Sequence, residues 1–177
     1  MENIKRVDRK LVYKGSIIDY YKDEMVTIDG NRAFWDHIEH KGAAAMLPVL
    51  EDGRIVLVRQ YRNSLEKEIL EIPAGGLEPG EDTMVAAKRE LEEETGYVAG
   101  EVSHLITINT TVAFCNEKIF IYVGHNLSQG VKHLDRDEYT DVEIYTLDEI
   151  VKMISEGEIT DSKTISAIMY YAHSIKG

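Results

Sequence analysis

The sequence of 177 residues predicts a fold of the α/β (α+β) class, in which many short strands accompany a few helices. Three observations support this prediction. The segment before His40 is rich in Val, Ile and Tyr, which favour strands. Asp29-Gly30 and Asp52-Gly53 are typical of tight turns between strands. Residues 81–95 then have apolar side chains at the spacing of one amphipathic helix.

The expected elements follow one another along the whole chain. The turn at Asp29-Gly30 joins two of the N-terminal strands, and residues 51–53 predict a second hairpin between the strands that flank them. Expected strands cover residues 10–14, 16–28, 32–40, 43–50, 54–61, 68–72, 98–109, 118–124 and 142–145, and expected helices cover 81–95, 147–156 and 162–174.

Composition narrows the possible functions. The length suits a domain with a sizeable core, and no apolar run is long enough to span a membrane. A formal net charge of -12 argues against a sequence-independent grip on nucleic acid, which needs a basic surface. No apolar run follows Met1, so we expect no signal peptide. Cys115 is the single cysteine, which excludes an internal disulfide and suits the cytoplasm.

Three glutamates on the helix expected at 81–95 point to a metal site. Glu90, Glu93 and Glu94 are spaced i, i+3 and i+4, so their side chains share one face. Like charges so close destabilise a helix unless something neutralises them. Mg²⁺ and Mn²⁺ prefer oxygen ligands, so this face is interpreted as a metal platform. The alternative is a solvated acidic face on a surface helix.

The residues around these glutamates fit the same interpretation. Arg89 precedes Glu93 by one helical turn and can hold its carboxylate. Pro79-Gly80 ends a loop before the helix, and Gly96 suits the position just past its end.

These residues also match a known pattern. The Nudix box reads G-x5-E-x7-R-E-U-x-E-E-x-G-U, where U is a bulky aliphatic residue. The chain supplies every fixed position of it and departs only at the last U, where Tyr97 stands; the matching residues are Gly75, Glu81, Arg89, Glu90, Leu91, Glu93, Glu94 and Gly96. The chain therefore resembles the Nudix hydrolases. That resemblance implies a mixed β-sheet sandwiched between α-helices, preceded by an N-terminal antiparallel β segment.

Longer segments resemble the ADP-ribose pyrophosphatase branch of this family. They include LPVLEDGRIVLVRQYR, EIPAGGLEPGED, LDRDEYTDVEIYTLDEI and the tail GEITDSKTISAI. The resemblance implies a Nudix hydrolase domain at 41–177 and a strand-rich dimerisation segment at 1–40, exchanged between the subunits of a homodimer. The alternative for residues 1–40 is an edge hairpin on a monomer.

The implied activity is cleavage of the diphosphate bond of a nucleoside diphosphate derivative. In this branch the substrate is ADP-ribose, which gives AMP and ribose 5-phosphate by attack of a metal-activated water. Residues 110–113 depart from the branch, because Thr-Thr-Val-Ala stands where a proline-rich S-P-G loop is usual. This departure keeps GDP-mannose or another nucleotide sugar open as the substrate. A domain that senses ADP-ribose without cutting it is a further alternative, although such domains usually lose a box glutamate.

The resemblance also assigns roles to individual residues. Mg²⁺ (or Mn²⁺) would be held by the backbone carbonyl of Ala74 together with Glu90, Glu93 and Glu94. Arg89 would orient Glu93, and Glu81 and Gly75 would support the box.

The remaining roles fall outside the box. Arg62 matches an arginine that contacts the substrate, while Arg59 is either a second substrate contact or a surface partner. Glu138 is the expected general base, followed by Asp137; the alternative is a solvated loop. Phe34 and Trp35 either stack on a purine or pack at a dimer contact.

Overall fold

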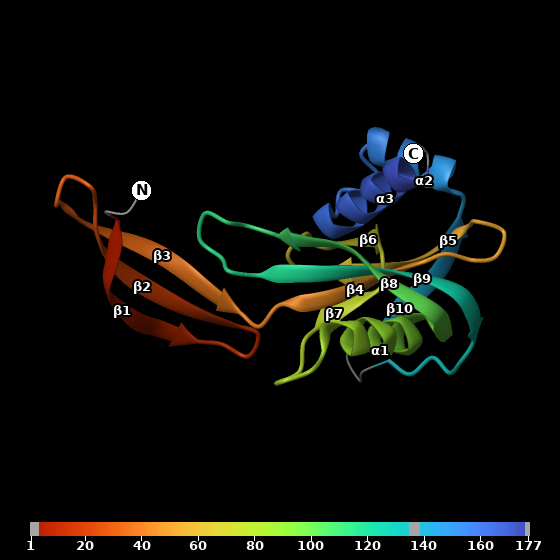
Figure 1. Ribbon diagram of the computed structural model, residues 1–177, viewed down its shortest axis with the longest axis horizontal. Coiled ribbons are helices and arrows are strands. Elements are labelled where there is room, and N and C mark those ends of the chain that lie inside the picture. The colour runs from red at the N-terminus through yellow and green to blue at the C-terminus, as the bar shows by residue number, and fades with distance from the viewer. Residues whose placement is uncertain (1–3, 135–138, 176–177) are drawn as a thin grey trace. The chain divides into compact units, whose positions relative to one another are not determined.

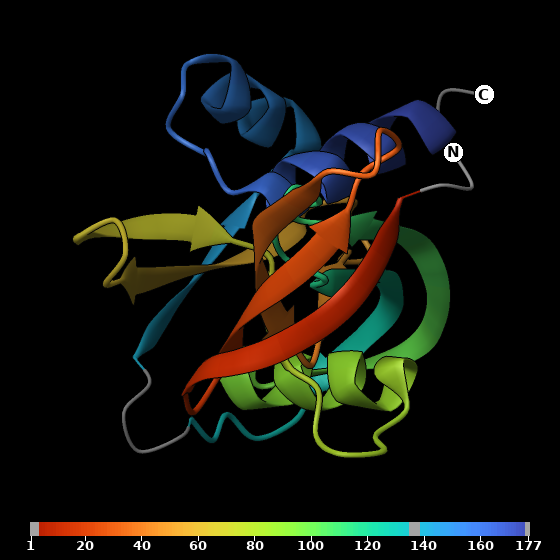
Figure 2. The ribbon, with the colours of Figure 1, turned by 90° about the vertical axis from the view of Figure 1, so that its left-hand side faces the viewer.

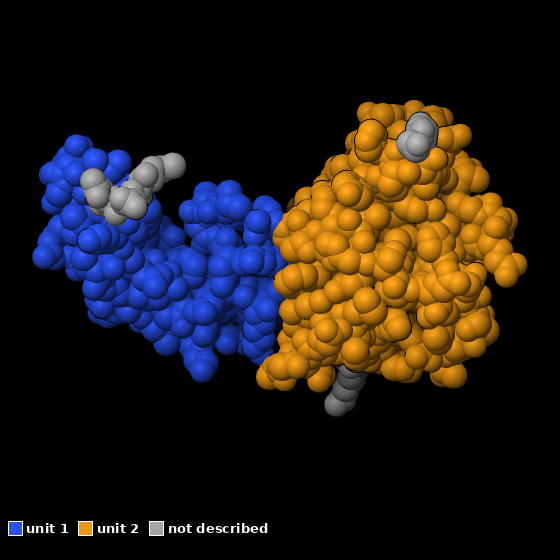
Figure 3. Space-filling model, viewed as in Figure 1, with its two compact units in different colours: residues 1–42, 109–118 blue, residues 43–108, 119–177 orange. Residues whose placement is uncertain are grey.

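The computed structural model describes residues 4–134 and 139–175 of the chain. They form two compact units, one of residues 1–42 and 109–118 and the other of residues 43–108 and 119–177 (Figure 3). We call them unit 1 and unit 2 and describe each by itself.

Unit 1 is built on a three-stranded antiparallel sheet in the order β1-β2-β3 (Figure 2). Its strands are β1 (Lys5–Lys14), β2 (Ile18–Val26) and β3 (Arg32–His40). The turn before β3 forms as expected, because Gly30 has φ of 77° and its N–H donates to the carbonyl of Thr27 at 2.9 Å. The start of β1 lies five residues before the expected one, since its charged residues also pair with β2.

A second segment completes unit 1, and the sequence did not predict it. Residues 109–118 run beside β3, where the N–H of Ile38 donates to the carbonyl of Phe114 at 2.7 Å. The N–H of His40 donates to Oδ1 of Asn116 at 2.8 Å. These contacts are far apart in sequence and follow no local periodicity.

Unit 2 contains seven strands in two sheets and three helices within the described residues. One sheet has the order β7-β4-β9-β8 and is mixed, because β4 pairs with β9 in parallel and with β7 in antiparallel. The other has the order β10-β5-β6. The strands are β4 (Ala43–Pro48), β5 (Ile55–Arg62), β6 (Lys67–Glu71), β7 (Ala74–Gly76), β8 (Tyr97–Asn109), β9 (Lys118–Gln129) and β10 (Thr140–Tyr145), and the helices are α1 (Thr83–Thr95), α2 (Leu147–Ser155) and α3 (Ser162–Ser174).

The expected hairpin between β4 and β5 forms only at its base, where Val49 and Ile55 make an isolated antiparallel bridge. The turn itself forms, since Gly53 has φ of 84° and the N–H of Leu50 donates to the carbonyl of Arg54 at 2.8 Å. However, β4 and β5 then enter different sheets. The reason is that β4 is buried along its length and takes β7 and β9 as its neighbours.

Two apolar clusters hold unit 2 together on opposite faces of β4. Ala44 and Met46 pack with Ala87 and Leu91 of α1. Ala45 and Leu47 face the other way, into a cluster shared with β5, β9, α2 and α3. Successive side chains of a strand point to opposite faces, so β4 lies between two cores. The mixed sheet therefore has α1 on one side and α2 and α3 on the other, as Figure 1 shows. None of the helices within the described residues could cross a membrane.

Candidate active site

Helix α1 carries the glutamates, and its ends are set by side chains that the sequence supplies. Asp82 caps the first turn, because its carboxylate accepts from the N–H groups of Met84 at 2.9 Å and Val85 at 3.2 Å. Gly96 ends the helix with φ of 74°, a left-handed conformation that glycine adopts without strain. These caps fix where α1 begins and ends. Packing of Ala87 and Leu91 on β4 sets the side that faces the core, and Glu90, Glu93 and Glu94 form what we call the acidic face.

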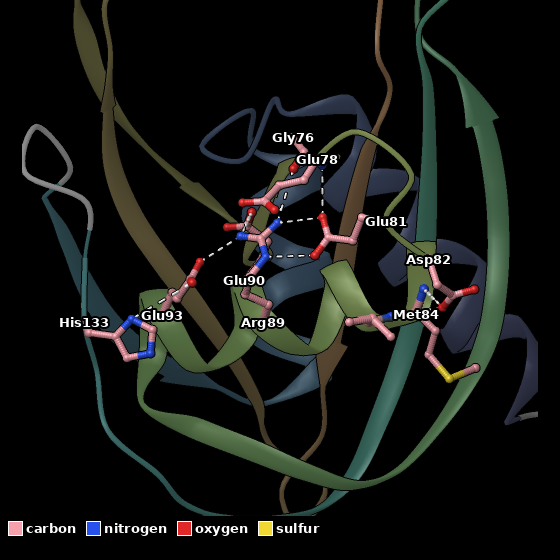
Figure 4. A network of polar contacts seen from close by, with 10 residues as sticks. Gly76, Glu78, Glu81, Asp82, Met84, Arg89, Glu90, Glu93 and His133 are labelled. Carbon is pink, nitrogen blue, oxygen red and sulfur yellow. Dashed lines mark hydrogen bonds and ion pairs between the residues drawn. The ribbon is translucent and has the colours of Figure 1, made fainter.

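Arg89 lies at the centre of this face and contacts three carboxylates (Figure 4). Its Nη1 donates to Oε1 of Glu90 at 2.6 Å and to Oε2 of Glu93 at 2.8 Å. Its Nε donates to Oε1 of Glu81 at 3.0 Å, and these bonds raise the pKa of Arg89 further above its ordinary value. One guanidinium therefore offsets the repulsion that the helical spacing creates.

Glu81 lies before α1 and holds Arg89 in this position. Its carboxylate accepts from Nε and Nη2 of Arg89 and from the N–H of Glu78 at 3.0 Å. The bond from Arg89 keeps the pKa of Glu81 below its usual range. Nη2 of Arg89 also donates to the carbonyl of Gly76 at 3.3 Å. Glu81 thus ties the loop before α1 to the acidic face.

Gly75 is required by the position of Glu90. A Cβ at position 75 would overlap the Glu90 carboxylate, whereas a Cβ at Gly76 would meet no atom within 4 Å. Gly75 lies in β7, the short strand that pairs with β4 beside α1. The backbone and the carboxylate can approach this closely only because residue 75 has no side chain.

Glu94 connects the acidic face to the backbone of β7. Its Oε2 accepts from the N–H of Ala74 at 3.1 Å, and both Glu90 and Glu94 are buried. Carboxylate oxygens beside a backbone segment are the donor set that a hard divalent cation prefers. The residues therefore fit such an ion by chemistry.

Two of the three carboxylates, those of Glu90 and Glu93, meet at Nη1 of Arg89. No group of three or more His, Cys, Asp or Glu side chains within the described residues has the geometry of a metal site. The contacts of Arg89 explain this, because they direct Glu90 and Glu93 toward its guanidinium.

Arg62 and Arg59, both expected on the substrate side, lie on opposite faces of β5, since they are three positions apart on one strand. Arg62 donates from Nε and Nη2 to the buried carboxylate of Glu71, at 2.6 and 2.9 Å. Arg59 donates from Nε to Glu143 of β10 at 2.5 Å. The structure therefore does not bring the two arginines together.

Four further candidates remain, of which the structure describes two. Glu138 and Asp137 lie outside the described residues. Phe34 and Trp35 line a hollow on unit 1 together with Phe114 and other residues of that unit.

Sequence reasoning missed two charged residues in unit 2. Glu71 and Lys163 are both buried and form an ion pair between β6 and α3. The sequence did hold a signal for the burial of Glu71. This residue stands among apolar neighbours in the segment EILEIPA, and a carboxylate that is buried in this way needs a charged partner.

An acidic helix behind a glycine-rich turn, with one arginine among its carboxylates, is the arrangement that the Nudix box predicts. The NUDIX domain profile matches residues 39–167, and the chain belongs to this family. The predicted family, fold and hydrolase class are thus confirmed.

Several similar proteins are known. The methanol dehydrogenase activator of Bacillus methanolicus is 40% identical over 168 residues, covering 94% of this chain and 91% of that protein. The ADP-ribose pyrophosphatase of Bacillus subtilis (strain 168) is 36% identical with the same coverage. A crystal structure of an ADP compounds hydrolase has the same fold, with a TM-score of 0.88 at 21% identity over 98% of this chain and 95% of that one.

Proposed function

We propose that the protein hydrolyses ADP-ribose to AMP and ribose 5-phosphate with the help of Mg²⁺ or Mn²⁺. The observation that carries this proposal is the acidic face of α1 held against Gly75, with every fixed glutamate of the box present. The similarity to a named ADP-ribose pyrophosphatase over most of both chains supports the substrate.

The proposed roles follow from the contacts. Glu90, Glu93 and Glu94, with the backbone carbonyl of Ala74, would hold the cation, which neutralises phosphate oxygens and acidifies the attacking water. Arg89 would keep the glutamates from repelling one another and orient Glu93.

We assign the general base to Glu138. Glutamates that hold a cation are poor bases, so the proton of the attacking water needs another acceptor. A general base contributes about 10²–10⁴ in rate, so Glu138→Gln is expected to lower kcat in that range with little change in KM. Asp137→Asn is the control for the neighbouring residue. If Asp137→Asn lowers kcat strongly while Glu138→Gln leaves kcat unchanged, the general base is Asp137.

Other substrates compete with ADP-ribose because residues 110–113 differ from the proline-rich loop that is usual in the ADP-ribose pyrophosphatase branch. A panel of ADP-ribose, GDP-mannose, ADP-glucose, NADH and diadenosine polyphosphates, read as phosphate released after phosphatase coupling, tests the choice. The highest kcat/KM for ADP-ribose supports the proposal, and a higher value for GDP-mannose overturns it. Tight ADP-ribose binding without turnover in saturating Mg²⁺ would favour the sensing alternative.

A second candidate role comes from the similarity to the methanol dehydrogenase activator. The chain would then stimulate a dehydrogenase through the same hydrolytic site. A methanol dehydrogenase assayed with the protein and with its Glu94→Gln variant tests this, because only the intact site should raise the rate.

We further propose that the protein is a cytoplasmic homodimer joined through residues 1–40. Apolar side chains on the surface of unit 1 support this assembly: Val12, Tyr13, Phe34 and Trp35 are all exposed. The single cysteine agrees with a reducing compartment.

A further inference from the structure

Arg62 is held from one side by a buried carboxylate. Its Nε and Nη2 donate in parallel to the two oxygens of Glu71, at 2.6 and 2.9 Å. This two-point contact fixes the plane of the guanidinium as well as its position. Glu71 is 2% exposed while Arg62 is 38% exposed, so the arginine has a buried edge and an open edge. Nη1 takes no part in these two bonds.

Glu71 is itself held by a buried lysine. Nζ of Lys163, in the first turn of α3, forms an ion pair with Oε2 of Glu71. The same Nζ donates to Oδ2 of Asp161 at 3.1 Å. Two cations and two anions therefore alternate through this network, from Arg62 to Asp161. A lysine is almost never buried unless it is paired in this way.

The network is tied to the backbone that leads into the active site. Asp161 caps α3 through the N–H and the hydroxyl of Thr164, at 2.9 and 2.6 Å. Oγ1 of Thr164 accepts from the N–H of Ile72 at 2.9 Å. Ile72 follows Glu71 and precedes Ala74 by two residues. The start of α3 therefore fixes the chain directly before β7.

Arg62 is bonded to Glu71, three residues before Ala74, whose N–H donates to Glu94 of the acidic face. The charge of Glu94 contributes to the raised pKa of Arg62, after the larger effect of its bond to Glu71. An arginine with one open edge, linked in this way to a face that is proposed to bind cations, suits an anionic phosphate oxygen. Replacing a buried ion pair by apolar residues is often neutral or stabilising. What apolar residues cannot do is orient a guanidinium.

We propose that Lys163 and Glu71 are positioning residues that aim the open edge of Arg62 at a phosphate oxygen of the bound diphosphate. This inference rests on the proposed function, since it takes a diphosphate as the ligand. Lys163 acts through Glu71 and does not touch the substrate itself.

The test is a double-mutant cycle between Lys163 and Arg62, measured as kcat and KM for ADP-ribose. Lys163→Met is expected to lower kcat/KM by about tenfold, in the range seen when outer-shell partners of a site are removed. Lys163→Arg keeps the positive charge and should restore activity to within about threefold. In an Arg62→Ala background, Lys163→Met should change kcat/KM by less than about twofold, because the group that it positions is gone.

The controls separate positioning from stability. Lys152→Met removes an exposed ion pair with Glu156 and should leave kcat/KM unchanged. If Lys163→Met lowers kcat/KM equally in the wild-type and Arg62→Ala backgrounds, its role is structural and the proposal is overturned. Should Lys163→Met fail to fold, Glu71→Gln takes its place in the same cycle.

A second readout does not depend on turnover. The Nε–H signal of Arg62 in an NMR spectrum reports its bond to Glu71, and Lys163→Met should shift it and speed its exchange with water. An unchanged signal overturns the positioning role even where activity falls. A wild-type protein that hydrolyses no diphosphate refutes the proposed function, while the Nε–H signal still decides whether Lys163 positions Arg62.

Discussion

The two units of the molecule differ in charge and in what they bury. Unit 1 carries nine basic and nine acidic residues, so the whole net charge of -12 belongs to unit 2. Unit 2 buries its apolar residues in two clusters, whereas unit 1 exposes many of its own. Strand β1 is nearly all exposed, and its exposed apolar side chains include Leu11, Val12 and Tyr13.

This difference separates two tasks. A strongly acidic unit repels an anionic substrate unless cations invert the local charge, so the charge of unit 2 agrees with the proposed metal dependence. A neutral unit with exposed apolar side chains is suited to contact another protein surface. We therefore expect substitutions in unit 2 to act on chemistry and those in unit 1 to act on assembly.

The largest effect is expected at the acidic face. Glu94→Gln removes the charge of a proposed metal ligand yet keeps an oxygen that can accept from the N–H of Ala74. Because cation contacts stabilise the transition state by several kcal/mol, kcat should fall by about 10³-fold with little change in thermal unfolding. EDTA should abolish turnover of the parent protein, and Mg²⁺ or Mn²⁺ should restore it. Full activity in excess EDTA contradicts the metal assignment.

A smaller effect is expected at the two glycines of β7, which form a matched pair. Gly75→Ala forces the Glu90 carboxylate to move, and Gly76→Ala places its methyl group in open space. Since misplacing a catalytic group by about 1 Å can lower the rate about 10²-fold, Gly75→Ala should lower kcat by that order. Gly76→Ala should stay near the parent. Equal kcat values for the two variants would show that the position of Glu90 is unimportant.

A variant of unit 1 tests whether the exposed apolar side chains of this unit serve in assembly. Phe34→Glu places a charge among the exposed aromatic side chains of this unit and should convert the proposed dimer to a monomer in light scattering. Leu65→Glu, at a similarly exposed leucine of unit 2, is the control and should leave the mass unchanged. If the parent is already a monomer with full turnover, the proposed assembly is wrong.

The sequence predicted what is local and missed what is brought together by folding. Glu90, Glu93 and Glu94 share a helical face because their spacing requires it, and Arg89 reaches Glu93 for the same reason. The sheet assignment of β4 depends instead on partners far along the chain. Pairing between Glu71 and Lys163 joins residues that are 92 positions apart, so no periodicity could reveal it.

The smallest effect concerns the stability of unit 1 in acid. Nε and Nη2 of Arg9 donate to the two oxygens of Asp23 at 2.6 and 2.7 Å, and this contact holds the pKa of Asp23 below its usual range. A carboxyl with a lowered pKa in the folded state stabilises the protein above its unfolded pKa of about 3.9. That contribution disappears as the pH falls below this value through the folded pKa.

Asp23→Asn should therefore lower the free energy of unfolding by about 2 kcal/mol at neutral pH, the range for a hydrogen bond to a charged group. The difference from the parent should shrink as the pH falls below about 4. Trp35, the single tryptophan, lies in β3, so its fluorescence reports unit 1, while the helical circular dichroism of the described residues comes from unit 2. Asp36→Asn changes only exposed contacts, with Lys22 and with the hydroxyl of Tyr20, and should have little effect. A destabilisation by Asp23→Asn that is constant between pH 7 and pH 3 would show that the ion pair is not its source.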